Sequence, residues 1–119
     1  MSYVDGYLIP IPKKNIAQYK KMAALGCKVW MDHGAIDYRE CVGEELKTKW
    51  GIPFTKLLKT KPSETVAFSW IVFKSKAHRN KVNAAVMKDP RLASSMNMKK
   101  MPFDPKKMCY GGFKTLVSK

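Results

Sequence analysis

The sequence predicts an α+β protein with the ferredoxin-like order of elements: strand, helix, strand, strand, helix, strand. Segments rich in β-branched and aromatic residues alternate with segments in which apolar residues recur at helical spacing. In this order the strands form one four-stranded antiparallel sheet, and two helices cover one of its faces. The length of 119 residues and the 45% apolar composition favour a single domain over residues 1–119.

The first half of the chain predicts two strands on either side of the longest helix. The first strand covers residues 3–11 and carries apolar side chains on both faces. A helix follows over residues 13–33, where an apolar residue recurs every three or four positions. We expect it to end at His33 and Gly34, because glycine accepts the left-handed conformation that ends many helices. The second strand covers residues 35–43.

The middle of the chain joins an irregular segment to the clearest strand. Residues 44–63 contain prolines, a glycine and many lysines, and we expect one short helical turn near residues 54–58. Residues 64–73 are dense in β-branched and aromatic side chains, and both faces of this strand are apolar.

The last quarter of the chain completes the predicted order. Ser75 is placed to cap a helix that ends at residues 89–90, and a short second helix follows over residues 91–96. Residues 97–107 are rich in methionine and lysine and are expected to form a loop. Residues 108–117 form the last predicted strand.

This arrangement leaves one face of the sheet without helices, although its strands carry apolar residues there. A patch of several hundred Å² is larger than monomers usually expose. Because burying it contributes about 25 cal/mol per Å², a partner is expected, and a second copy of the chain is the simplest one. We therefore expect a homodimer joined through the sheet face.

The net charge of +14, from 23 basic and 9 acidic residues, favours anionic partners in general. The basic residues are spread along the chain, whereas nucleic-acid-binding proteins usually gather them on one surface. The strand order also describes RNA-recognition domains, but Glu64 and Thr65 stand where those domains need a basic residue and glycine. Nucleic-acid binding is therefore the least favoured alternative.

The cysteines and the chain start favour a cytoplasmic protein. Three cysteines without CxxC spacing, accompanied by two histidines, argue against a disulfide framework or a zinc site. The N-terminus lacks a secretory pattern, and no apolar run reaches the roughly 18 residues that span a bilayer. No motif indicates a metal, a cofactor or membrane association.

Polar and aromatic residues within the strands are the candidate ligand-binding residues. If some of them face an enclosed interior, they line an apolar cavity with a few polar groups, which is typical of small-molecule sites. The alternative is an edge salt bridge between Asp5 and Arg39, with tyrosines satisfied at the rim. The candidates are Asp5, Tyr7, Tyr38, Arg39, Ser69, Trp70 and Tyr110, with Glu40 beside them.

Two further features, His78 and a glycine pair, have two interpretations each, and Cys41 has one. His78 lies near a helix start, where it suits a neutral base, or it is a surface histidine facing solvent. The pair Gly111 and Gly112 suggests a glycine-rich loop, but it lies within a strand pattern, where glycine pairs more often mark a bulge or a close approach of another backbone. Cys41 lies in a strand and is expected in the core.

Several runs of residues resemble the YbaA-like family of uncharacterised bacterial proteins, and the likeness extends from residue 3 to about residue 117. These runs are Tyr3-Val4-Asp5-Gly6-Tyr7, Tyr38-Arg39-Glu40-Cys41-Val42-Gly43, Phe68-Ser69-Trp70-Ile71-Val72-Phe73-Lys74-Ser75, Ala77-His78-Arg79, Asp89-Pro90-Arg91-Leu92, Met101-Pro102-Phe103-Asp104 and Tyr110-Gly111-Gly112-Phe113.

The resemblance implies a ferredoxin-like subunit of the dimeric α/β-barrel superfamily, and it implies no particular reaction. Relatives in that superfamily include cofactor-independent monooxygenases, haem-degrading enzymes, isomerases and binding domains, so an activity would rest on fold analogy alone. A homodimer with a small-molecule pocket in or beside the barrel is the leading expectation. A cofactor-independent monooxygenase or isomerase is the alternative.

Overall fold

The structure is a computed structural model that describes residues 1–95 and 100–119. Its sheet has the strand order β2-β3-β1-β4, and each neighbouring pair is antiparallel. The strands are β1 (Tyr3–Pro12), β2 (Asp37–Val42), β3 (Glu64–Phe73) and β4 (Cys109–Lys114). The helices are α1 (Ile16–Asp32), α2 (Phe54–Leu57), α3 (Lys76–Met87) and α4 (Pro90–Ser95), with 3₁₀ turns at Lys13–Asn15 and Pro105–Lys107.

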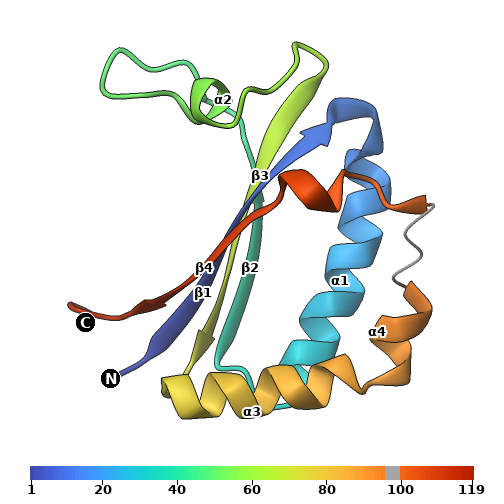
Figure 1. The fold of residues 1–119 in the computed structure, drawn as a ribbon, viewed down its shortest axis with the longest axis vertical. Helices are drawn as coiled ribbons and strands as arrows, with labels where there is room; N and C mark the ends of the chain where they lie inside the picture. Colours follow the sequence, from blue (N-terminus) through green and yellow to red (C-terminus); the bar gives the residue numbers. More distant parts are fainter. Residues whose placement is uncertain (96–99) are drawn as a thin grey trace.

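The expected ferredoxin-like α+β fold is confirmed. Helices α1, α3 and α4 lie on one side of the sheet, and the excursion with α2 and both chain ends lie on the other (Figure 1). Strand β3 has the predicted bounds, and α2 begins at the predicted position. The last strand is shorter than predicted and ends at Lys114. Residues 96–99 of the predicted short helix and loop lie outside the described residues.

Both helix ends predicted from local chemistry are confirmed. Helix α1 is followed by Gly34 with a φ of 110°, and the backbone N–H of His33 donates to the carbonyl of Val29 at 3.1 Å. At the start of α3, the Ser75 hydroxyl accepts a hydrogen bond from the backbone N–H of His78 at 3.1 Å. These contacts satisfy backbone groups that lack partners within the helices.

The core lies between the sheet and its helices and is divided into two clusters. One cluster joins β3 to α1, α3 and α4, and the other joins β1 and β3 to α1 and the segment before β4. Members of both clusters line the cavity described below. The buried members are Val29, Ala35, Ile71, Phe73, Val82, Val86 and Leu92 in the first, and Ile9, Ile11, Tyr19, Ala23, Ala67 and Phe103 in the second.

The face away from the helices exposes large apolar side chains. Phe68 on β3 is 46% exposed and Phe113 on β4 is 62% exposed. Cys41 is also exposed, so its predicted core position is wrong: its partner in the register is Phe68, which places it on the uncovered face. Over the described part of the chain, no helix is both long and apolar enough to cross a membrane.

Candidate functional site

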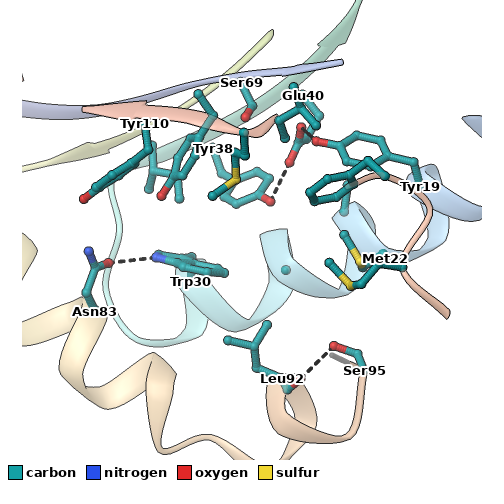
Figure 2. Close-up of a pocket in the computed structure, with 18 of the residues that line it drawn as sticks. Tyr19, Met22, Trp30, Tyr38, Glu40, Ser69, Asn83, Leu92, Ser95 and Tyr110 are labelled. Atoms are coloured by element: carbon teal, nitrogen blue, oxygen red, sulfur yellow. Dashed lines mark hydrogen bonds between the residues drawn. The ribbon is translucent and has the colours of Figure 1, made fainter. Parts of the chain in front are cut away.

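A cavity of about 340 Å³ lies between the sheet and helices α1, α3 and α4. Figure 2 shows aromatic side chains from the sheet on one side of it and side chains from the helices on the other. Most of the lining groups are apolar or aromatic. The lining residues are Tyr7, Ile9, Tyr19, Met22, Ala23, Gly26, Trp30, Tyr38, Glu40, Ser69, Ile71, Asn83, Met87, Leu92, Ser95, Met101, Phe103, Met108 and Tyr110.

One end of the cavity is organised around the carboxylate of Glu40. The Tyr19 hydroxyl donates to Glu40 Oε1 at 2.6 Å, and the Tyr38 hydroxyl donates to Glu40 Oε2 at 2.7 Å (Figure 2). Tyr38 and Glu40 are two residues apart on β2 and therefore share a face, where they lie opposite Ile71 and Ser69 of β3. The two hydroxyl groups fix the orientation of the carboxylate.

The pKa values of both tyrosines rise well above their ordinary value. For Tyr19 and Tyr38, burial is the largest cause, and the charge and hydrogen bond of Glu40 add to it. Burial also raises the pKa of Tyr7, with a further contribution from the charge of Asp5. These phenols therefore stay protonated near neutral pH and act as hydrogen-bond donors.

The other end of the cavity has a chain of polar contacts that connects two helices to the sheet. Trp30 Nε1 donates to Asn83 Oδ1 at 3.0 Å, and Asn83 Nδ2 donates to Asp5 Oδ2 at 3.2 Å. Arg79 lies 3.3 Å from Asp5 Oδ1 and donates a hydrogen bond to the Tyr110 hydroxyl at 2.8 Å. The chain fixes α3 against β1 and β4.

Asp5 and Arg79 form a buried ion pair behind the cavity wall. Asp5 is completely buried, and the side chain of Arg79 is 16% exposed. Their close contact lacks hydrogen-bond geometry, so Asp5 Oδ1 and Arg79 Nε have no hydrogen-bond partner among the described residues. The Arg79 guanidinium also lies 4.9 Å from the centre of the Tyr3 ring, which adds a cation–π contact.

The glycines of β4 allow a close approach by a side chain of β1. The register of β4 on β1 is continuous through Gly111 and Gly112, without a bulge. A Cβ atom on Gly112 would collide with the Tyr3 ring. The pair therefore lies within a strand, as expected, but it accommodates a side chain rather than a bulge or another backbone.

The cavity brings together four of the predicted ligand-binding residues: Tyr7, Tyr38, Ser69 and Tyr110. Their strands place them on the helix-covered face, so the cavity lies within one subunit, beside the expected barrel interior. Asp5 shares this face and reaches the cavity through Asn83. The rings of Tyr7 and Tyr110, from paired positions of β1 and β4, lie 5.0 Å apart.

The structure places the other three predicted residues away from the cavity. Arg39 and Trp70 are paired across β2 and β3 on the uncovered face. The alternative of a salt bridge between Asp5 and Arg39 is wrong, because they lie on opposite faces and Arg39 contacts Asp37 at 3.7 Å. His78 lies at the start of α3, where its Nδ1 accepts a hydrogen bond from the backbone N–H of Lys74 at 3.0 Å.

Four residues of the site were missed as functional candidates. Tyr19 and Trp30 belong to the apolar stripe of α1 and resemble ordinary core residues in the sequence. Asn83 and Arg79 lie on α3 and gain their roles only through contacts with the sheet. Glu40 had been named beside the candidates. Its position two residues from Tyr38 on the same strand face is the sequence signal that links it to the site.

A second hollow of about 470 Å³ lies along the outer edge of β2 against α1. It shares Tyr19, Tyr38 and Glu40 with the cavity, so this hydrogen-bonded group forms part of the wall of both. Lys20 lines the outer hollow and does not line the cavity. Within the ranges that the structure describes, no group of three His, Cys, Asp or Glu side chains is placed to hold a metal ion.

A comparison of structures supports the fold and the sequence comparisons show the family. A crystal structure of an uncharacterized NIPSNAP domain protein from Burkholderia xenovorans matches with a TM-score of 0.61 and 11% identity, over 97% of this chain and 95% of that one. At this level of identity the match supports the fold alone.

The relatives found by sequence comparison share a higher identity with this chain than the crystal structure does. The "Uncharacterized protein YbaA" of Escherichia coli strain K12 is 34% identical over 117 residues, covering 98% of both chains, and the protein of the same name in Shigella flexneri matches equally well. The family model described as "Protein of unknown function (DUF1428)" matches residues 2–105. The chain therefore belongs to this YbaA-like family of uncharacterised proteins of unknown function.

Proposed function

We propose that this protein binds one small, largely apolar molecule in the cavity between the sheet and its helices. The observation that carries the proposal is the cavity itself, about 340 Å³ in volume, with aromatic walls and two separate polar ends. Ligand sites usually measure about 300–1,000 Å³ and combine apolar walls with a few placed polar groups. The alternative of a cofactor-independent enzyme is not favoured by any of these observations.

The polar groups of the cavity are held in place before any ligand arrives. Glu40 is oriented by two tyrosines, and Asn83 is fixed between Trp30 and Asp5. Groups that are already ordered lose little conformational entropy when they bind a ligand. The cavity therefore has the properties of a selective binding site for a molecule of fixed shape.

Native mass spectrometry of freshly purified protein, followed by titration with para-tert-butylbenzyl alcohol, tests this proposal. We expect a retained ligand or a bound alcohol in the parent protein. Met22→Trp should abolish both, because the larger ring fills the cavity that Met22 lines. Met31→Trp is the matched control, since Met31 lies on the same helix, is 41% exposed and does not line the cavity. Equal binding by parent and Met22→Trp would contradict the proposal.

We further propose that the protein forms a homodimer through the uncovered sheet face. The face exposes Phe68 and Phe113, and the α2 excursion and the C-terminal segment, on the same side of the sheet in Figure 1, expose further apolar residues. Exposed apolar side chains gathered on one side of a protein often mark an interaction surface, and a two-fold contact covers them on both copies at once. The exposed residues of these two segments include Trp50, Ile52, Leu57, Leu116 and Val117.

Sedimentation analysis at micromolar concentration tests the dimer. We expect the parent protein to sediment as a dimer and Phe68→Glu to sediment as a monomer, because the new carboxylate would be buried without a partner. Met31→Glu, on the helix side, should remain dimeric. A monomeric parent protein would refute this proposal and leave the ligand-binding proposal standing.

A further inference from the structure

We propose that the cavity selects an organic cation, an ammonium group carried on an apolar body, with Glu40 as its counter-charge. This inference rests on the proposed ligand-binding function and names the chemical class of the ligand. Three observations support it: the ion pairing of the acidic residues, the unused acceptor positions of Glu40 and the composition of the cavity walls.

The charge of Glu40 is not balanced by a basic side chain of the described chain. Four aspartates lie within 4.0 Å of a lysine or arginine nitrogen, whereas Glu40 has hydrogen-bond donors but no such ion pair. Among the described residues, four other acidic residues, Glu44, Glu45, Glu64 and Asp104, also lack such a pair, but Glu40 is the acidic one that lines the cavity. The paired aspartates are Asp5, Asp32, Asp37 and Asp89.

The two tyrosines orient the Glu40 carboxylate but leave it with acceptor capacity. An ionised carboxylate accepts about four hydrogen bonds, and Tyr19 and Tyr38 supply one to each oxygen. A neutral hydroxyl donor does not cancel the negative charge. Glu40 lines the cavity, so a cationic N–H or a quaternary ammonium there would meet an uncompensated negative charge at short range.

The walls of the cavity favour the same ligand class. Six aromatic rings line it, and the faces of aromatic rings attract cations. None of the described lining residues is Lys, Arg or His. Two basic residues beside the cavity do not line it: Arg79 pairs with Asp5, and Lys20 lines the outer hollow. The rings are Tyr7, Tyr19, Trp30, Tyr38, Phe103 and Tyr110.

The charge of the cavity is therefore opposite in sign to the net charge of the protein. The net charge of +14 attracts anions to the surface in general, while the cavity offers them a carboxylate and ring faces that repel them. A neutral apolar molecule fits the walls but leaves the charge of Glu40 unused. An ammonium on an apolar body uses both, so it should bind tightest.

Calorimetric titration with three probes, each a para-substituted benzyl alcohol, tests the inference. The probes are para-trimethylammonio-benzyl alcohol, its neutral isostere para-tert-butylbenzyl alcohol, and the anion para-hydroxymethyl-benzoate. We expect the parent protein to bind the ammonium probe about tenfold tighter than the neutral one, and the anion weakest. The probes differ in charge, so the ratio of the first two affinities isolates the contribution of charge.

Two variants test whether Glu40 causes the preference for the ammonium probe. In Glu40→Gln, which keeps the size of the side chain, we expect the ammonium preference to fall to about twofold or less while the neutral probe binds as before. Glu45→Gln is the matched control, because Glu45 is exposed and the substitution changes the net charge equally. It should keep the tenfold preference.

The outcomes separate this inference from the function on which it rests. Equal binding of the ammonium and neutral probes by the parent protein would overturn the cation preference and leave the ligand-binding function intact. A preference that persists in Glu40→Gln would overturn the role of Glu40. If the parent protein binds none of the three probes, the inference fails, and the retained ligand in native mass spectrometry decides the proposed function alone.

Discussion

Each face of the sheet carries some side chains that burial alone would place on the other, although the core lies on the helix-covered face. An antiparallel sheet with one covered face usually turns apolar residues to the core and polar residues to water. Here the helix-covered face carries Asp5, Glu40 and Ser69, while the uncovered face exposes Phe68 and Phe113. Each face carries side chains that would be expected on the other.

The residues that depart from the usual pattern are explained better by the proposed functions than by the stability of the fold. Buried polar groups contribute little to stability unless they are hydrogen-bonded, and apolar residues of similar size often serve the core as well. The polar groups of the covered face converge on one cavity, which agrees with the proposed binding site. The apolar groups of the uncovered face agree with the proposed dimer, in which they would leave water.

The largest expected effect compares one phenylalanine from each face. Phe73 is fully buried between β3 and the helices, so Phe73→Ala should lower the free energy of unfolding by about 3–5 kcal/mol. Phe113→Ala removes a side chain that is 62% exposed and should change it by less than about 1 kcal/mol. Urea denaturation at low protein concentration measures both. Similar losses in the two variants would show that the uncovered face is packed within one subunit.

The two faces also carry one ion pair each, and these pairs should differ in strength. Asp5→Asn leaves Arg79 buried without a counter-charge and should cost about 3 kcal/mol. Asp37→Asn breaks a pair with Arg39 whose side chains are both exposed, and it should cost about 1 kcal/mol or less. Thermal unfolding followed by circular dichroism compares the variants.

A double variant sharpens this second comparison. Combining Asp5→Asn with Arg79→Met removes both charges, so the loss should be smaller than the sum of the two single losses. Additive losses would mean that the two charges do not interact across their 3.3 Å contact.

Much of the fold could be predicted because its signals are local. The alternation of side chains gave the bounds of β3, and Gly34 and Ser75 marked helix ends through hydrogen bonds within a few residues. The site depends on contacts between distant segments. Asn83 reaches Asp5 across 78 positions, and no pattern within α3 distinguishes it from a solvent-facing residue.

The placement of Arg39 shows the same limit. Asp5 and Arg39 look like partners in the sequence, but the register aligns Asp5 with Ile71 and Arg39 with Trp70. Neighbouring residues of β3 point to opposite faces, so the two charges are separated by the sheet. If β1 or β2 paired with β3 one residue further along, Asp5 and Arg39 would lie on the same face. The register depends on the whole sheet, so it cannot be read from either strand alone.

The smallest expected effect concerns the tyrosines of the covered face at high pH. The pKa of Tyr38 is raised chiefly by burial, so the folded protein keeps this proton at a pH where the unfolded chain, with a pKa of about 10, loses it. Stability from this source is therefore complete below about pH 10 and declines as the pH rises above it. Tyr38→Phe removes one such group and should make the decline shallower by up to about 1.4 kcal/mol per pH unit. Urea denaturation between about pH 8 and 12, with phenolate absorbance as a second readout, measures the slope; an unchanged slope in Tyr38→Phe would mean that the phenol ionises as freely in the folded protein as in the unfolded chain.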